Sequence, residues 1–152
     1  MNNRLFSVCF CLSLFLLCGS CTDNRLTEKE MAQIERYTKT ESHDDLLFGQ
    51  WKDNTLFQHD GKDAYIMIAF DSEGMVKEKM FVGDKAFNDW HFLYYYYTKD
   101  GKVFYYRPAE SGFLAMDGEV SLDYGYEISA DGRSLTIRDK NHGNKTYTKI
   151  EL

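Results

Sequence analysis

The chain has 152 residues, of which 43% are hydrophobic, 28% charged and 16% aromatic, and its formal net charge is −6. This length fits one domain of ordinary size, and the composition excludes an intrinsically disordered chain. The acidic balance argues against nucleic acid as a partner, because phosphate binding needs a basic face. It also argues against charge-driven binding to acidic lipid headgroups. The single proline and the eleven tyrosines favour β structure.

The first 20 residues have the pattern of a secretory signal. Arg4 precedes an unbroken run of apolar and small residues over 5–17. That run is too short for a transmembrane helix, which needs about 20 residues, and is typical of the apolar part of a signal peptide. We therefore expect residues 1–20 to be removed on export.

The segment Leu17-Cys18-Gly19-Ser20-Cys21 resembles a bacterial lipobox. The resemblance implies that Cys21 is diacylated and becomes the mature N-terminus. The protein would then be a lipoprotein of the cell envelope, held at the outer membrane by this lipid anchor. The alternative is an ordinary signal that is cleaved nearby and releases a soluble protein.

The cysteines all lie at or before the expected cleavage site. They are Cys9, Cys11, Cys18 and Cys21. Since the mature domain would keep no other thiol, we expect no disulfide within it, no cysteine nucleophile and no cysteine metal site.

Residues 21–45 form a polar tether in which 26–37 has a helical pattern. Thr27 and Glu30 have the spacing of a capping box, which satisfies free N–H groups at a helix start. Met31, Ile34 and Tyr37 form a thin apolar stripe. We expect a helix that packs loosely on the domain; a partner-binding helix is the alternative.

From Leu46 onward the hydrophobic pattern alternates, and acidic-Gly pairs recur between the alternating segments. Such pairs favour tight hairpins, because the primed turns require positive φ. The expected strands lie near 47–53, 64–71, 75–82, 91–98, 102–108, 119–129, 133–139 and 145–152. These predict an all-β domain over 46–152, an eight-stranded antiparallel up-and-down barrel with a short N-terminal helix. A two-sheet sandwich is the alternative.

The hairpin around 131–132 has a testable register. A two-residue loop there pairs Tyr126 with Ile137 and Ile128 with Leu135, so that apolar side chains meet apolar ones on one face. Because a slip of one residue would put these apolar side chains on the other face, the pairing is a specific prediction of the register.

The hairpin around 100–101 is expected to pair Tyr95 with Tyr106. It is aromatic on both faces, so that its orientation is ambiguous. We place one set inward because Arg107, on the opposite face, should remain in water. The inward set is Leu93, Tyr95, Tyr97, Phe104 and Tyr106. The outward aromatic set is Phe92, Tyr94, Tyr96 and Tyr105.

The hairpin over 65–82 has a three-residue loop at 72–74. This loop pairs Phe70 with Val76 and places Glu78 opposite Ile68, on the apolar face. A β-bulge that rotates Glu78 outward is the favoured explanation, and a carboxylate pointing into the interior is the alternative.

Gly49-Gln50-Trp51 on the first strand, Phe70 before an acidic-Gly turn, and the repeated hairpins resemble the lipocalin-like (calycin-type) small β-barrel lipoproteins of Gram-negative bacteria. The resemblance implies a binding barrel. In lipocalins a basic residue near the barrel end packs on the first-strand Trp, a role that Lys149 would fill. We expect Trp51 itself to be a structural plug at the closed end.

The sequence indicates no catalytic chemistry. The four histidines (His43, His59, His91 and His142) lack metal-ligand spacing, and we expect those in the tether and turns to be solvated. Nucleophile-elbow, P-loop and dinucleotide motifs are absent from the sequence. We therefore expect no enzyme activity, no cofactor and no metal site; an envelope hydrolase would need a polar cleft.

The leading hypothesis is an envelope lipoprotein whose barrel binds a small apolar or aromatic-compatible ligand. The expected contacts are Tyr95, Tyr97, Phe104, Tyr106 and Tyr126, with Glu78 as a polar contact. The alternative is a non-catalytic module whose outward aromatic set binds an envelope protein or a glycan.

Overall fold

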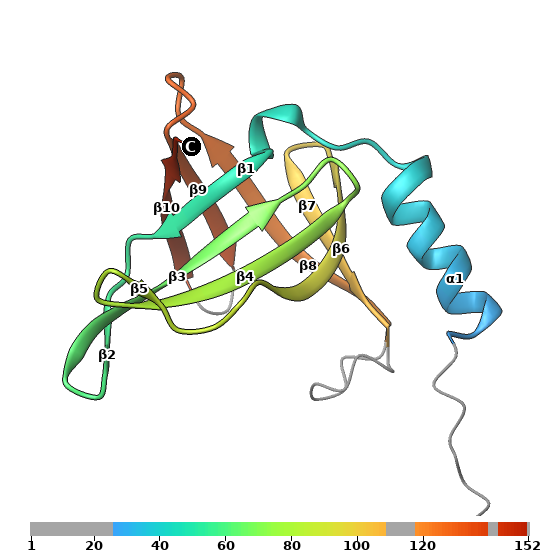
Figure 1. The fold of residues 1–152 in the computed structure, drawn as a ribbon. Coiled ribbons are helices and arrows are strands. Elements are labelled where there is room, and N and C mark those ends of the chain that lie inside the picture. The colour runs from blue at the N-terminus through green and yellow to red at the C-terminus, as the bar shows by residue number, and fades with distance from the viewer. Residues whose placement is uncertain (1–25, 109–117, 140–142, 152) are drawn as a thin grey trace, which may run out of the picture.

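The computed structural model describes residues 26–108, 118–139 and 143–151, and side chains from 26–108, 124–139 and 143–151. The expected signal peptide and Cys21 lie outside these residues. The chain forms a closed antiparallel β-barrel with a short helix against its outer surface (Figure 1). Its elements are α1 (Glu28–Glu35), a π-helical turn (Arg36–Thr40), a 3-10 turn (Asp45–Leu47), β1 (Gly49–Asp53), β2 (Phe57–His59), β3 (Lys62–Phe70), β4 (Met75–Val82), β5 (Lys85–Ala86), β6 (His91–Lys99), β7 (Lys102–Arg107), β8 (Gly118–Ile128), β9 (Ser134–Asp139) and β10 (Gly143–Ile150).

Eight strands make the barrel wall: β1, β3, β4 and β6 to β10, each paired antiparallel with the next. The barrel closes because β1 pairs with β3 on one side and with β10 on the other. This confirms the predicted up-and-down barrel and excludes the sandwich. The short strands β2 and β5, which the sequence did not predict, extend the β3–β4 hairpin beyond the wall.

The predicted registers of the hairpins are confirmed. Tyr126 pairs with Ile137 across β8 and β9. Tyr95 pairs with Tyr106 across β6 and β7. The turn between β6 and β7 has φ of 52° at Asp100 and 69° at Gly101, the left-handed values that a primed two-residue turn requires.

The predicted orientation of the β6–β7 hairpin is right for Leu93, which packs against the main core, and wrong for its four other inward residues. Tyr96 and Tyr105 belong to the main core inside the barrel. The cause is a β-bulge in β6: Tyr94 pairs with Val76 of β4, whereas Phe92 pairs with the next residue, Lys77. The intervening residue has no partner on β4, so that the alternation of faces shifts by one.

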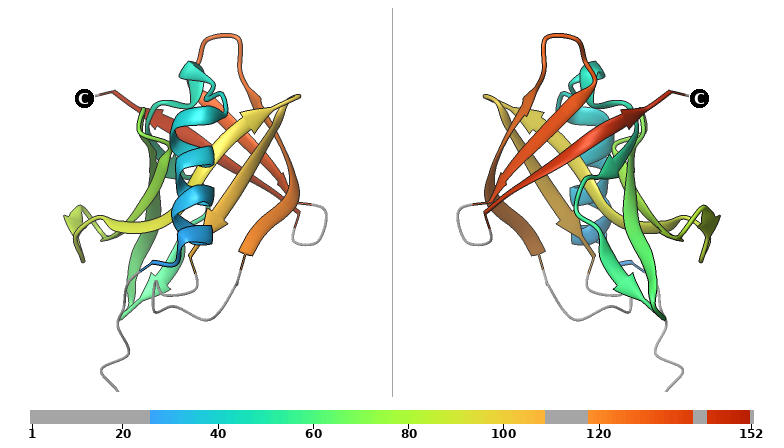
Figure 2. Two further views of the ribbon diagram at one scale, coloured as in Figure 1. Left: turned by 90° about the vertical axis from the view of Figure 1, so that its right-hand side faces the viewer. Right: turned by 90° about the vertical axis from the view of Figure 1, so that its left-hand side faces the viewer.

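The four other hairpin aromatics, Tyr95, Tyr97, Phe104 and Tyr106, therefore face outward, where α1 and the π-helical turn cover them (Figure 2). Tyr37 is fully buried there, with its ring centre 4.7 Å from that of Tyr97 and 5.5 Å from that of Tyr106. The π-helical turn is thus tightly packed through Tyr37, whereas α1 contributes no buried residue, in line with the loose packing expected of the helix.

The start of α1 agrees with the sequence. The backbone N–H of Glu30 donates to the Thr27 hydroxyl (3.2 Å), and the N–H of Thr27 donates to the Glu30 carboxylate (2.8 Å). This is the predicted capping box. Of the apolar stripe, Tyr37 is buried and Ile34 half-buried, but Met31 remains exposed.

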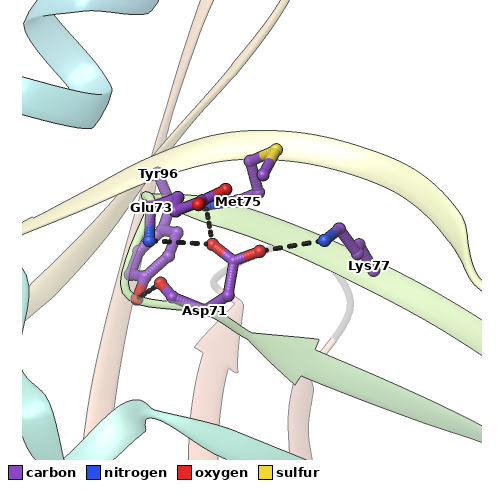
Figure 3. A network of polar contacts seen from close by, with 5 residues as sticks. All are labelled: Asp71, Glu73, Met75, Lys77 and Tyr96. Atoms are coloured by element: carbon purple, nitrogen blue, oxygen red, sulfur yellow. Dashed lines mark hydrogen bonds and ion pairs between the residues drawn. The ribbon is translucent and has the colours of Figure 1, made fainter.

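The turn between β3 and β4 is organised by Asp71 (Figure 3). One carboxylate oxygen accepts the N–H groups of Glu73 (3.1 Å) and Met75 (2.9 Å), and the other pairs with the Lys77 ammonium (3.0 Å). The hydroxyl of the fully buried Tyr96 donates to the Asp71 carbonyl (3.1 Å). The turn thus supplies the hydrogen bond that a buried tyrosine needs.

Candidate functional site

The barrel interior holds a cavity of about 440 Å³ that is partly open to solvent, a volume within the usual range of small-molecule pockets, roughly 300–1,000 Å³. Its walls are mainly aliphatic and aromatic side chains on seven strands. The described residues that line it are Ile68, Val76, Leu93, Tyr94, Tyr105, Tyr124, Ile137, Asp139, Gly143, Lys145 and Tyr147.

Four tyrosines give the cavity hydroxyl groups. The ring of Tyr105 lies 5.2 Å from that of Tyr94 and 5.8 Å from that of Tyr124. Burial raises the pKa of Tyr105 well above its ordinary value, and burial raises the pKa of Tyr147 as well. Burial and the Asp139 carboxylate raise the pKa of Tyr124 to about 12. These three phenols are therefore protonated at neutral pH and can donate as well as accept hydrogen bonds.

Charged groups gather where β9 ends and β10 begins. Asp139 and Lys145 line the cavity there. The Lys145 ammonium lies 3.9 Å from the carboxylate of the buried Asp53, which also accepts the N–H of Thr55 (2.8 Å). This end of the barrel is the polar rim of an otherwise apolar site.

The opposite end is closed by a fully buried indole. Trp51 donates from Nε1 to the Leu47 carbonyl at 2.7 Å. The Tyr126 hydroxyl, at the same end, donates to the Asp44 carboxylate (2.8 Å). Trp51 is thus the plug that the sequence predicted, and Tyr126 is engaged with the segment that covers the barrel end.

The cavity does not use the residues that the sequence suggested. The predicted contacts Tyr95, Tyr97, Phe104 and Tyr106 pack under the helix, on the other side of the wall. The outward aromatic set is also misplaced, since Tyr94 and Tyr105 line the cavity and Tyr96 lies in the core. The surface that the alternative hypothesis required is therefore not formed by these three side chains.

The β-bulge expected at Glu78 is not formed, which is a second correction to the sequence-based prediction. The β3–β4 pairing runs without interruption from Ala64↔Val82 to Phe70↔Val76, so that no bulge turns Glu78 outward. It lies directly opposite Ile68, a cavity residue, and its charge contributes to the raised pKa of Tyr147. The carboxylate is half-buried near the cavity rather than part of its lining.

Two further lining residues could have been found from the sequence. Tyr124 lies two residues before Tyr126, so that the predicted β8–β9 register already places both on the inner face. Tyr147 on β10 lies directly opposite Leu135 of β9, so that both side chains are on the same face of the wall. The inward positions of Leu93 and Tyr94 depend on the bulge, for which the sequence has no marker.

His43 is a structural residue rather than the solvated one expected. Its Nε2 lies 2.8 Å from the carbonyl oxygens of both Tyr37 and Tyr96. Because both partners are acceptors, this nitrogen carries a proton. The contact fastens the tether to β6.

No protein-family model matches the chain, and no curated protein or solved structure matches it either. Among the described residues, no group of three or more His, Cys, Asp or Glu is arranged to hold a metal ion. None of the described helices combines the length and the hydrophobicity that crossing a membrane requires.

Proposed function

We propose that the protein is a cell-envelope lipoprotein whose barrel binds one small, mostly apolar molecule. The observation that carries this proposal is the cavity of about 440 Å³ inside the wall, lined by aliphatic and tyrosine side chains. An eight-stranded barrel either fills its interior with side chains or holds one small ligand. A lumen left this open favours the second use.

The lining defines the chemistry of the ligand. Ile68, Val76 and Ile137 favour an apolar body. Protonated tyrosine hydroxyls offer hydrogen bonds that fix its orientation. Asp139 and Lys145 at the rim suit a polar end group that remains close to water. The ligand is therefore an elongated or ring-shaped apolar molecule with one polar end, held without covalent chemistry and without a cofactor.

The remaining parts of the proposal concern location and family. A diacyl group on Cys21 would hold the protein at the outer membrane. The resemblance to lipocalin-like lipoproteins is supported by the closed end, where the Lys149 ammonium lies 4.9 Å from the centre of the Trp51 ring. This is the basic-residue contact that the resemblance implies.

A thermal-shift panel tests the binding function. The melting temperature of the purified protein is measured with fatty acids, lysophospholipids, small aromatic acids and glycans. A ligand that binds only the folded state at a hundred times its Kd adds about 2.7 kcal/mol to the unfolding free energy. A rise with one apolar class and not with glycans is expected, and a flat response to every apolar class contradicts the proposal. Mass spectrometry of the N-terminal peptide tests the lipid on Cys21 separately.

A further inference from the structure

The large apolar side chains exposed to solvent gather at one end of the molecule. In the described part of the chain six such residues are exposed, and only Leu46 lies at the closed end, beside the turn that carries Leu47. The other five lie in the first turn of α1, two residues before that helix, and on or beside β2 and β5. These five, called here the mouth-end apolar set, are Leu26, Met31, Leu56, Phe57 and Phe87.

The topology places this set around the polar rim of the cavity. β10 begins at the rim, and β1 is antiparallel to it, so that β1 ends at the rim with Asp53 and the chain continues there into β2. The ring of His59 on β2 lies 4.8 Å from that of Phe87 after β5, which joins these two segments. Figure 1 shows α1 beginning on the opposite side of the same end.

The short segment between Cys21 and α1 favours a membrane as the surface that contacts this end of the barrel. Four residues separate Leu26 from Cys21, so that the two lie at most about 18 Å apart along a fully extended chain. α1 then runs from the mouth end toward the closed end, and both views in Figure 2 show this direction. An anchor at Cys21 therefore keeps the mouth end near the bilayer and the closed end away from it.

We propose that the mouth end of the barrel rests on the lipid surface, with the mouth-end apolar set inserted at the boundary between headgroups and acyl chains. The proposal rests on the lipid anchor of the proposed function and adds the orientation of the barrel. Its consequence is that an apolar ligand passes between the bilayer and the cavity at the rim, with little exposure to water.

The contact is apolar rather than electrostatic. Charges of both signs flank the set, with Asp60 near Lys62 and Asp84 next to Lys85, so that these described residues form no single-sign patch to attract anionic lipid. Near Phe87, the Lys79 ammonium lies 5.9 Å from the Trp90 ring. Aromatic residues combined with lysine are typical of side chains at a membrane interface.

A matched pair of tryptophan probes tests the orientation. Phe87 at the mouth end and Leu46 at the closed end are both 60% exposed. In a Trp90→Phe background, Phe87→Trp and Leu46→Trp are compared in the full chain bound to phosphatidylcholine vesicles with brominated acyl chains, which quench nearby indoles. Interfacial insertion reaches only 5–10 Å into the lipid, and we therefore expect quenching about threefold stronger for Phe87→Trp.

Each outcome of this comparison decides the proposal. Equal quenching, or stronger quenching of the Leu46→Trp probe, overturns it. An unquenched Phe87→Trp probe in a protein that sediments as a dimer also overturns it and assigns the surface to a second copy. A quenching ratio that vanishes in high salt contradicts the apolar contact. A lipid-free Cys21 in the mass spectrum refutes the anchor, whereas the quenching ratio reports on the orientation alone.

Discussion

Lys149 and Trp51 are direct cross-strand neighbours on β10 and β1, and the Lys149 ammonium lies 4.9 Å from the centre of the indole. The same ammonium donates to the Leu46 carbonyl at 3.3 Å. Gly49, with φ of 121°, leaves room for the lysine chain, because a Cβ there would lie 3.3 Å from Lys149 Cε. The first and last strands of the barrel are thus joined at its closed end.

Lys149→Ala should lower the unfolding free energy by about 1 kcal/mol, because it removes a partly desolvated cation–π contact and the aliphatic cover over the indole. Urea denaturation measures this change. Lys85→Ala, an exposed lysine on β5, is the matched control and should change stability by less than about 0.5 kcal/mol. Equal effects of the two substitutions would contradict the role given to Lys149.

Tyr37→Ala should release the helix from the barrel. Removing a fully buried aromatic ring costs about 3–5 kcal/mol, and here the loss falls on the contact between the tether and the β6–β7 hairpin. We expect fast hydrogen exchange of α1 amides while barrel amides keep most of their protection. Met31→Ala changes a side chain of the same helix that is 51% exposed and should leave exchange unaltered. Unchanged protection of α1 in Tyr37→Ala would refute the docking.

The protein should lose stability in alkali. Burial, with the neighbouring Asp139 and Asp44 carboxylates respectively, raises the pKa of both Tyr124 and Tyr126 to about 12. Because the folded state holds these protons more tightly than the unfolded state, the stabilisation is complete below the ordinary tyrosine pKa of 10.0 and is lost as pH rises toward 12.

Denaturation at a series of pH values, with tyrosinate absorbance followed in parallel, checks the alkaline prediction. Tyr124→Phe should make the fall in unfolding free energy shallower, since the phenylalanine ring has no proton to release. If all tyrosines titrate together near their ordinary pKa, without loss of stability, the raised pKa values of Tyr124 and Tyr126 are contradicted.

The sequence allowed the strands and hairpins to be predicted because alternation and acidic-Gly turns are local features. The register at Tyr126 and Ile137 depended only on such features, and it is correct. Which side chains of the β6–β7 hairpin point into the barrel depended on two non-local features. One is the bulge opposite β4, and the other is the helical segment that covers the outer aromatic side chains. With both faces equally aromatic, hydrophobicity alone could not distinguish Tyr105 from Tyr106.

The expected solvation of Arg107 misled the assignment for a physical reason. Arg107 shares its face with Tyr105, and its guanidinium lies 5.9 Å from the Tyr94 ring, half-buried on the inner side. A long side chain near the end of a strand can cover an aromatic ring and still keep its charged group at the barrel rim. An arginine at a strand end therefore does not identify the outer face.

Native mass spectrometry of protein purified without detergent tests the ligand cavity most directly. Leu93 lines the cavity, whereas Tyr95 faces the helix two residues later, so that Leu93→Trp and Tyr95→Trp place the same indole on opposite sides of one strand. We expect a bound apolar molecule in the unaltered protein and in Tyr95→Trp, with occupancy roughly tenfold lower in Leu93→Trp, a loss of about 1.4 kcal/mol in binding. An empty barrel in all three proteins that also binds no added fatty acid, or equal occupancy in both variants, would contradict this expectation.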